Sequence, residues 1–176
     1  MPPSALCWAD LGTGSGCLAV ALARALPAWS GLAVDLSDRA LAVAAANLAA
    51  AGVDGRVVLR SGSWWDPLRP WWGTLALVLA NPPYIPTSVW ERLEPGVRCH
   101  EPALALDGGQ DGLSALRTIV AGAPQALAPG GVLLLEHHHD QSAAVLALLE
   151  HAGLEQPQAH RDLEGHWRFA SACKPR

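Results

Sequence analysis

A glycine-rich loop near the start of the chain directly follows an apolar run and could bind a small-molecule ligand. The run Leu6–Leu11 leads into Gly12-Thr13-Gly14-Ser15-Gly16, with glycine at every second position. Glycine permits a tight turn and lets the backbone approach a ligand without a Cβ in the way. The free N–H groups that open a following helix then favour a negatively charged group. A purely structural glycine turn is the alternative.

The spacing of these glycines indicates the kind of ligand. A dinucleotide-binding loop has the pattern G-x-G-x-x-G and would place its third glycine at position 17, where this chain has Cys17. The third glycine stands one residue earlier instead. This spacing fits a ligand without a pyrophosphate, such as S-adenosylmethionine, whose carboxylate can meet the helix terminus.

An acidic residue and a pair of tryptophans follow the next two apolar runs. Asp35 ends the second run, roughly 20 residues beyond the glycine loop, where a carboxylate can accept hydrogen bonds from ribose hydroxyls. It could instead cap the following helix, although Ser37 or Asp38 can serve that cap equally well. Either Trp64 or Trp65 could stack on an adenine ring, and the other could belong to the core.

The motif Asn81-Pro82-Pro83-Tyr84 follows a fourth apolar run and indicates a reaction at a planar nitrogen. The prolines fix φ and lack N–H donors, which leaves the Asn81 amide oxygen and the Pro82 carbonyl as acceptors on a rigid frame. Two acceptors can hold both N–H bonds of a planar –NH2 group and orient its nitrogen toward an electrophilic methyl. Tyr84 supplies a ring on which the amide plane can pack. A simple Pro-Pro turn is the alternative.

Together these motifs resemble the protein-(glutamine-N5) methyltransferases that modify peptide chain release factors. The resemblance rests on Asp10–Gly16, Asp35, Trp64 and Asn81–Tyr84, and it continues at Val97-Arg98, Glu101-Pro102, Leu104–Gly109, Asp111-Gly112-Leu113, Gly130–Glu136 and Arg161-Asp162-Leu163. Enzymes that methylate exocyclic amines of adenine or guanine share the tetrad. The stretch from Arg98 through Leu113 favours the release factor family.

The resemblance implies an S-adenosylmethionine-dependent enzyme that methylates the side-chain amide of a glutamine in a peptide chain release factor. By the same resemblance, the methionine and ribose parts of the cofactor bind Gly12, Thr13, Gly14, Ser15, Gly16 and Asp35, and Trp64 lies near the adenine. Asn81 contacts both cofactor and substrate, and Pro82, Pro83 and Tyr84 complete the catalytic amide clamp. The implied transfer is direct, with no covalent enzyme intermediate and no metal.

The elements that position these motifs alternate short apolar runs with longer helical ones, which is typical of β-α-β units in a doubly wound parallel sheet. We expect strands at Leu6–Leu11, Gly31–Asp35, Arg56–Ser61, Leu75–Ala80 and Gly131–Glu136, with Pro129-Gly130-Gly131 separating the fourth from the fifth. We expect helices at Gly16–Leu26, Ser37–Ala51, Leu113–Ala128 and Gln141–Ala152. The segments Leu154–Asp162 and Trp167–Cys173 predict an antiparallel hairpin at the sheet edge. The resemblance implies an α/β, Rossmann-like, seven-stranded methyltransferase sheet, mostly parallel, with this hairpin at its C-terminal end.

The segment from Ile85 to Gly112 is too long for a passive connection, so we expect it to shape the substrate pocket. Arg98 and Glu101 could pair to hold this loop together.

Length and composition exclude several classes of protein. The 176 residues suit one domain with a substantial core, so residues 1–176 are expected to form a single methyltransferase domain. The net charge of −4 and the scattered basic residues disfavour a nucleic-acid partner. No apolar run reaches membrane-spanning length and no basic segment opens the chain, which indicates a cytoplasmic protein, expected to be a monomer. The four cysteines lack C-x-x-C spacing and indicate reduced structural thiols.

Several departures from the family leave alternatives open. The helical substrate-docking domain that usually precedes the methyltransferase domain is expected to be absent, because the first strand begins close to Met1. Ser63 stands where many relatives carry an acidic residue. The run His137-His138-His139 could bind a metal or lie in a solvated loop. The alternative functions are a DNA or RNA base amino-methyltransferase and a truncated, non-catalytic homologue that binds cofactor.

Overall fold

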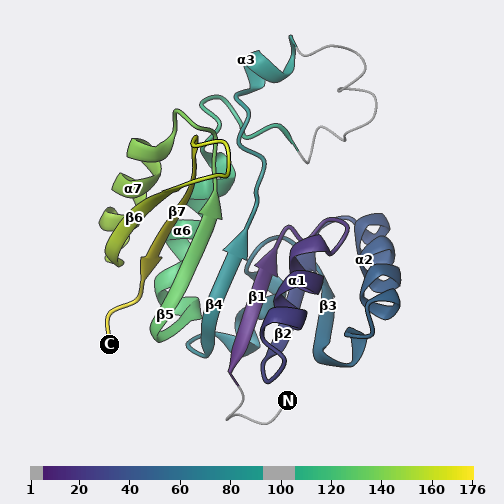
Figure 1. The fold of residues 1–176 in the computed structure, drawn as a ribbon. Coiled ribbons are helices and arrows are strands. Elements are labelled where there is room, and N and C mark those ends of the chain that lie inside the picture. Colours follow the sequence, from purple (N-terminus) through teal and green to yellow (C-terminus); the bar gives the residue numbers. More distant parts are fainter. Residues whose placement is uncertain (1–5, 93–105) are drawn as a thin grey trace.

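Seven strands form one sheet in the order β3-β2-β1-β4-β5-β7-β6 (Figure 1). The computed structural model describes residues 6–92 and 106–176. The strands are β1 (Cys7–Leu11), β2 (Ser30–Asp35), β3 (Val57–Ser61), β4 (Leu75–Ala80), β5 (Leu127–Glu136), β6 (Glu155–Arg161) and β7 (Trp167–Cys173). Neighbours among β1 to β5 pair in parallel, whereas β7 pairs antiparallel with both β5 and β6. The predicted fold class and the C-terminal hairpin are confirmed.

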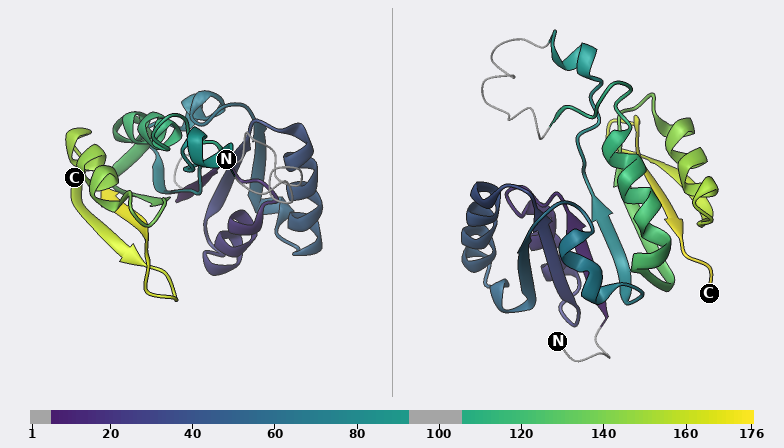
Figure 2. Two further views of the ribbon diagram at one scale, coloured as in Figure 1. Left: turned by 90° about the horizontal axis from the view of Figure 1, so that it is seen from above. Right: turned by 180° about the vertical axis from the view of Figure 1, so that it is seen from behind.

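Helices cover both faces of the sheet (Figure 2). They are α1 (Cys17–Ala25), α2 (Asp38–Ala50), α3 (Thr87–Trp90), α6 (Ser114–Ala126) and α7 (Ser142–His151), with the 3-10 helices η1 (Asp54–Arg56) and η2 (Asp66–Trp71). Residues of α1 and α2 share one buried cluster with Trp8, whereas η2, α6 and α7 contribute to a second cluster with Ala9. Successive side chains of a strand point to opposite faces, so these clusters lie on the two sides of the sheet. None of the helices in the described ranges is long and apolar enough to cross a membrane.

The start of β5 differs from the prediction. Pro129-Gly130-Gly131 lie inside the strand and do not separate β4 from β5. The strand begins at Leu127, directly after α6, because Leu127 is buried and pairs with Leu75 of β4. The ladder then shifts register and resumes at Val132. On the other side, the Lys174 backbone exchanges hydrogen bonds of 2.9 and 3.0 Å with the glycines, so the irregular stretch stays within the sheet.

The carboxyl ends of β1, β2, β3 and β4 meet at one edge of the sheet. Gly12 follows β1, Asp35 ends β2, Gly62 follows β3 and Asn81 follows β4. Because β1 lies between β2 and β4, the strand order reverses at this point. Ligands of open α/β sheets bind outside such a switch point. The fold therefore brings the predicted motifs to one place.

Candidate functional site

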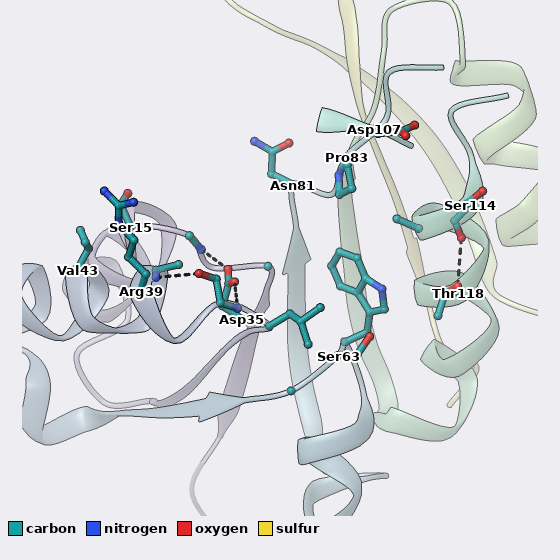
Figure 3. Close-up of a pocket in the computed structure, with 18 residues that line it drawn as sticks. Ser15, Asp35, Arg39, Val43, Ser63, Asn81, Pro83, Asp107, Ser114 and Thr118 are labelled. Atoms are coloured by element: carbon teal, nitrogen blue, oxygen red, sulfur yellow. Dashed lines mark hydrogen bonds between the residues drawn. The ribbon is translucent and has the colours of Figure 1, made fainter. Parts of the chain in front are cut away.

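A cavity of about 680 Å³ opens at this edge of the sheet (Figure 3). It is lined by seven of the predicted site residues, namely Gly12, Gly14, Ser15, Asp35, Trp64, Asn81 and Pro83. We call residues 12–16, 35–43 and 62–64 the glycine-loop side and residues 81–84, 107 and 114–118 the tetrad side. The volume lies within the range of roughly 300 to 1,000 Å³ that is usual for small-molecule sites.

Backbone hydrogen bonds hold the glycine loop against the end of β2. The amides of Gly12 and Thr13 donate to the Val34 carbonyl at 2.9 and 2.8 Å. The Gly14 amide donates to Asp35 Oδ2 at 2.8 Å. Helix α1 begins just after this loop, and its N-cap residue, Gly16, has no side chain to cap it. Since a helix N-terminus favours negative charge, this end of α1 suits the carboxylate of a ligand.

Two of the predicted cofactor residues, Thr13 and Gly16, lie behind the cavity lining. Thr13 is buried, and its hydroxyl donates to Asp10 Oδ2 at 2.6 Å. Gly16 has a φ of 79° and lies against α2, where a Cβ would come within 3.0 Å of the Ala44 Cβ. The third glycine of the loop is therefore needed at position 16 for a left-handed turn beside α2. A cofactor contact of either residue stays a prediction.

Asp35 lines the cavity with a carboxylate that accepts two backbone hydrogen bonds. Its Oδ2 faces the Gly14 amide, and its Oδ1 accepts from the Ser37 amide at 2.9 Å. The side chain that caps α2 is that of Ser37, which accepts from the Ala40 amide at 3.2 Å. A carboxylate oxygen has lone pairs for more than one donor, so Asp35 can still accept from a ligand. Its contact with ribose stays a prediction.

Asp10 places a buried carboxylate beneath the glycine loop. Burial raises the pKa of Asp10 to about 6, against the lowering effects of the Thr13 hydroxyl and the Ala19 amide, and the charge of Asp35 adds a small increase. Within the described residues, Asp10 Oδ1 has no hydrogen-bond partner. The ionised form of Asp10 is therefore costly in the folded state at neutral pH.

The two adjacent tryptophans have different surroundings. Trp64 lines the cavity beside the glycine loop, and a Cβ at Gly12 would come within 3.2 Å of its ring. Trp65 is buried in the core, where its indole N–H donates to the Ile119 carbonyl at 3.1 Å. This placement agrees with the choice of Trp64 as the residue near the adenine. The adenine contact itself stays a prediction.

A rim that the sequence prediction omits lies between Asp35 and the first turns of α2. Leu36 and Val43 line the cavity although 55% and 45% of their surfaces are exposed. Arg39 brings a guanidinium to the same rim, and Ser63 lines the cavity from the β3 end. The sequence did carry a signal for these residues: the expected helix begins directly after Asp35, so its first turns had to lie beside the predicted cofactor site.

The tetrad forms the opposite side of the cavity. The Asn81 side chain is exposed at the end of β4 (Figure 3), and no described residue forms a hydrogen bond with it. Pro83 lines the cavity, whereas Pro82 is buried and is not among the described lining residues. The Asn81 amide is therefore available to an incoming ligand. Its role in clamping a substrate amide, together with the Pro82 carbonyl, stays a prediction.

Tyr84 is anchored beside the cavity at two points. Its hydroxyl donates to Glu136 Oε1 at 3.0 Å, and its carbonyl accepts from Gln141 Nε2 at 3.0 Å. Burial raises the pKa of Tyr84, and the charge of Glu136 raises it further. The phenol therefore stays protonated near neutral pH and can keep its hydrogen bond to Glu136.

Polar residues of the long loop and of α6 complete the tetrad side. Asp107 lines the cavity, and its Oδ1 accepts from the Thr87 hydroxyl at 2.8 Å and the Gly109 amide at 2.9 Å. Ser114 and Thr118 also line the cavity. Residues four apart share a helix face, so their spacing at the start of an expected helix was a usable signal.

Part of this loop lies outside the described residues. That part includes the expected pair Arg98 and Glu101, and the resemblance at Val97 and Pro102. Among the described residues of the loop, Asp107 lines the cavity.

The three consecutive histidines have protein partners. His137 is buried, with Nδ1 2.7 Å from the His138 carbonyl and Nε2 3.4 Å from the Ser142 hydroxyl. His138 Nδ1 lies 2.6 Å from Asp140 Oδ1. In residues 6–92 and 106–176, no three His, Cys, Asp or Glu side chains form a group that could hold a metal ion.

Comparison with protein families matches residues 4–91, half of the chain, to the methyltransferase small domain. Curated relatives extend the match. A release factor glutamine methyltransferase of Prochlorococcus marinus is 52% identical over 168 residues, which cover 96% of this chain and 57% of that protein. A protein of the same name from Thermosynechococcus vestitus is 47% identical over 96% of this chain and 58% of its own length. The chain thus spans a little over half the length of these relatives.

Solved structures agree on the fold. A ribosomal protein L11 methylase from Lactobacillus delbrueckii subsp. bulgaricus matches 98% of this chain and 72% of its own, with a TM-score of 0.66 and 22% identity. Likeness at this identity extends to the architecture alone.

Proposed function

The chain belongs to the methyltransferase small domain family, and from that premise we propose that it methylates the side-chain amide nitrogen of a glutamine in a peptide chain release factor. Residues 1–176 act in this proposal as one S-adenosylmethionine-dependent methyltransferase domain. The observation that carries it is the meeting of the glycine loop, Asp35, Trp64 and the Asn81–Tyr84 tetrad around one cavity. The relatives' names favour a glutamine substrate over a nucleic-acid base.

The glycine-loop side fits the cofactor on three observations. The N-cap residue of α1, Gly16, makes no side-chain cap hydrogen bond, Asp35 retains acceptor capacity, and Trp64 presents a ring beside Gly12. These features suit a carboxylate, ribose hydroxyls and an adenine in turn. When bound, S-adenosylmethionine would supply an electrophilic methyl group: a nitrogen–carbon bond replaces the carbon–sulfur bond, S-adenosylhomocysteine leaves, and the surplus proton of the amide nitrogen passes to solvent.

The tetrad side orients the nucleophile in this proposal. The Asn81 amide oxygen and the Pro82 carbonyl accept the two N–H bonds of the substrate amide, so that its nitrogen faces the glycine-loop side. Because the substrate amide donates both of these hydrogen bonds, more electron density remains on its nitrogen, which is ordinarily a poor nucleophile. The Tyr84 ring, held through its hydroxyl by Glu136, supports the plane of the amide. Most of the rate enhancement then comes from positioning and electrostatics.

The direct test is incubation with methyl-labelled S-adenosylmethionine and purified release factor, followed by mass-spectrometric mapping. We expect label on one glutamine side chain, and none when that glutamine is replaced by asparagine. Duplex DNA and transfer RNA serve as competing substrates over a salt titration. Label on a nucleic-acid base would assign the chain to the base methyltransferases. Binding of S-adenosylhomocysteine without transfer to any substrate would support a non-catalytic role.

A further inference from the structure

The two described ends of the long loop join directly after the tetrad. The Ile85 amide donates to the Leu106 carbonyl at 3.1 Å, and the Gly108 amide donates back to the Ile85 carbonyl at 2.8 Å. The Thr87 amide then donates to the Gly109 carbonyl at 2.9 Å. These bonds place the segment 106–112, hereafter the return segment, beside the tetrad. They also carry Asp107 to the cavity lining.

The return segment lies so close to the tetrad that glycine is required there. A Cβ at Gly112, whose φ is 74°, would come within 2.4 Å of the Tyr84 carbonyl oxygen and 2.6 Å of Gln141 Nε2. A Cβ at Gly108 would come within 2.8 Å of the Tyr84 Cα. Movement of the return segment would therefore displace the tetrad backbone.

Gln141 joins these segments to a third. Its Nε2 donates to the Tyr84 carbonyl at 3.0 Å and to the Gly112 carbonyl at 3.3 Å, while its Oε1 accepts from the His138 amide at 2.9 Å. The side chain is buried, at 7% exposure. One amide thus uses two donors and one acceptor to link the tetrad, the return segment and the turn after β5.

Its place in the chain shows that this side chain does not cap its own helix. Gln141 is the N-cap residue of α7, yet it makes no side-chain cap hydrogen bond to that helix. A capping residue is usually Ser, Thr, Asp or Asn, and a longer amide at this position reaches past the helix end. The start of α7 thus positions Gln141 for its contact with Tyr84, 57 residues away in sequence.

We propose that Gln141 is a positioning residue for methyl transfer, which holds the tetrad and the return segment in register so that Asn81, Pro83 and Asp107 face one cavity. The inference rests on the proposed function. Gln141 itself does not line the cavity and acts through the Tyr84 and Gly112 carbonyls. Because a 1 Å displacement of a positioning group can lower a rate by on the order of 100-fold, this link is expected to affect turnover more than binding.

The test compares Gln141→Glu with Gln141→Leu and with the control Gln125→Glu, which changes an exposed residue of α6. Gln141→Glu keeps the length and the acceptor for His138 but turns an oxygen toward two carbonyl oxygens. We expect the kcat for methylation of the release factor to fall roughly 10- to 100-fold in both Gln141 variants. The KM for S-adenosylmethionine should change less than about twofold, and the control should match the wild type.

A second readout does not depend on activity. Amide hydrogen exchange should accelerate in peptides that cover the return segment, while peptides of β1 and β2 keep their protection. Unchanged exchange with unchanged kcat in folded Gln141→Glu and Gln141→Leu would overturn the proposal. The proposal would also be overturned if the fall in kcat came with a similar fold-loss of cofactor affinity and a lower melting temperature. Gln141 would then have a general structural role. If the wild type methylates no release factor, the proposed function fails, and the exchange measurement still decides whether Gln141 holds the return segment.

Discussion

Four backbone amides organise the glycine-loop side of the cavity, whereas side chains from distant segments organise the tetrad side. The amides of Gly12, Thr13, Gly14 and Ser37 donate to Val34 or Asp35, all within residues 12–37. The Tyr84 contacts of the tetrad reach 52 and 57 residues along the chain, to Glu136 and Gln141. One side is therefore held by contacts between two neighbouring strand ends. The other depends on the completed fold, and its alignment can be lost while the first side remains intact.

The largest expected effect is the loss of methyl transfer when the tetrad side is changed at Asn81 and the glycine-loop side is left intact. Asn81→Ala should lower the rate of methyl transfer about 100- to 1,000-fold, because it removes a polar contact that orients the nucleophile. The side chain is exposed and unbonded among the described residues, so the melting temperature should stay close to that of the wild type. Single-turnover kinetics, calorimetry with S-adenosylhomocysteine and thermal melting on one sample give the three values.

Asn47→Ala is the matched control for this experiment. Asn47 of α2 donates to the Ser15 carbonyl at 2.8 Å and so supports the glycine-loop side. Its loss should weaken cofactor binding by about 1 kcal/mol and leave single-turnover transfer at saturating cofactor nearly unchanged. A stable Asn81→Ala protein with a near-normal rate would refute the amide clamp.

The buried Asp10 should make the stability of the glycine-loop side depend on pH. Its pKa is raised from 3.8 to about 6, so the folded state binds the proton more tightly than the unfolded state. By linkage, the contribution of Asp10 to stability is fully present below about pH 4, is lost between about pH 4 and pH 6, and stays level above that. The free energy of unfolding falls by up to about 3 kcal/mol over this range.

Asp10→Asn should abolish this dependence, since the amide carries no titrating proton. Urea unfolding of both proteins at pH 4.5, 5.5 and 7 tests it, with the variant gaining stability relative to the wild type as the pH rises. A stability difference that is constant over this range would show that the folded state does not raise the pKa of Asp10.

Asp35→Ala is expected to weaken the binding of S-adenosylhomocysteine by about 1.5 to 3 kcal/mol. The same carboxylate supports the Gly14 and Ser37 amides, so the melting temperature should also fall. Asp35→Asn retains one acceptor and should show a smaller loss in both. Calorimetry that detects normal affinity in Asp35→Ala would leave Asp35 with only its structural contacts.

The contrast between the two sides also explains what could be read from the sequence. The glycine spacing, Asp35 and the tetrad lie at strand ends, where apolar runs and turn residues determine the local path. Gln141 and Asp107 could not be placed in this way, because their contacts depend on how a long loop returns to the sheet. The start of β5 was misplaced for a related reason, since pairing of the buried Leu127 overrides the break that Pro129 and its glycines suggest. The monomeric state and the cytoplasmic location stay predictions.

The exposed rim beside Asp35 gives ligand binding a thermal signature. Leu36 and Val43 line the cavity while about half of each side chain remains in contact with water. A ligand that covers them removes apolar surface from solvent, and such burial lowers the heat capacity of the complex relative to the free components. The enthalpy of binding should therefore become more favourable as the temperature rises. The entropic contribution shrinks in compensation, so that affinity itself varies much less with temperature than either of its parts.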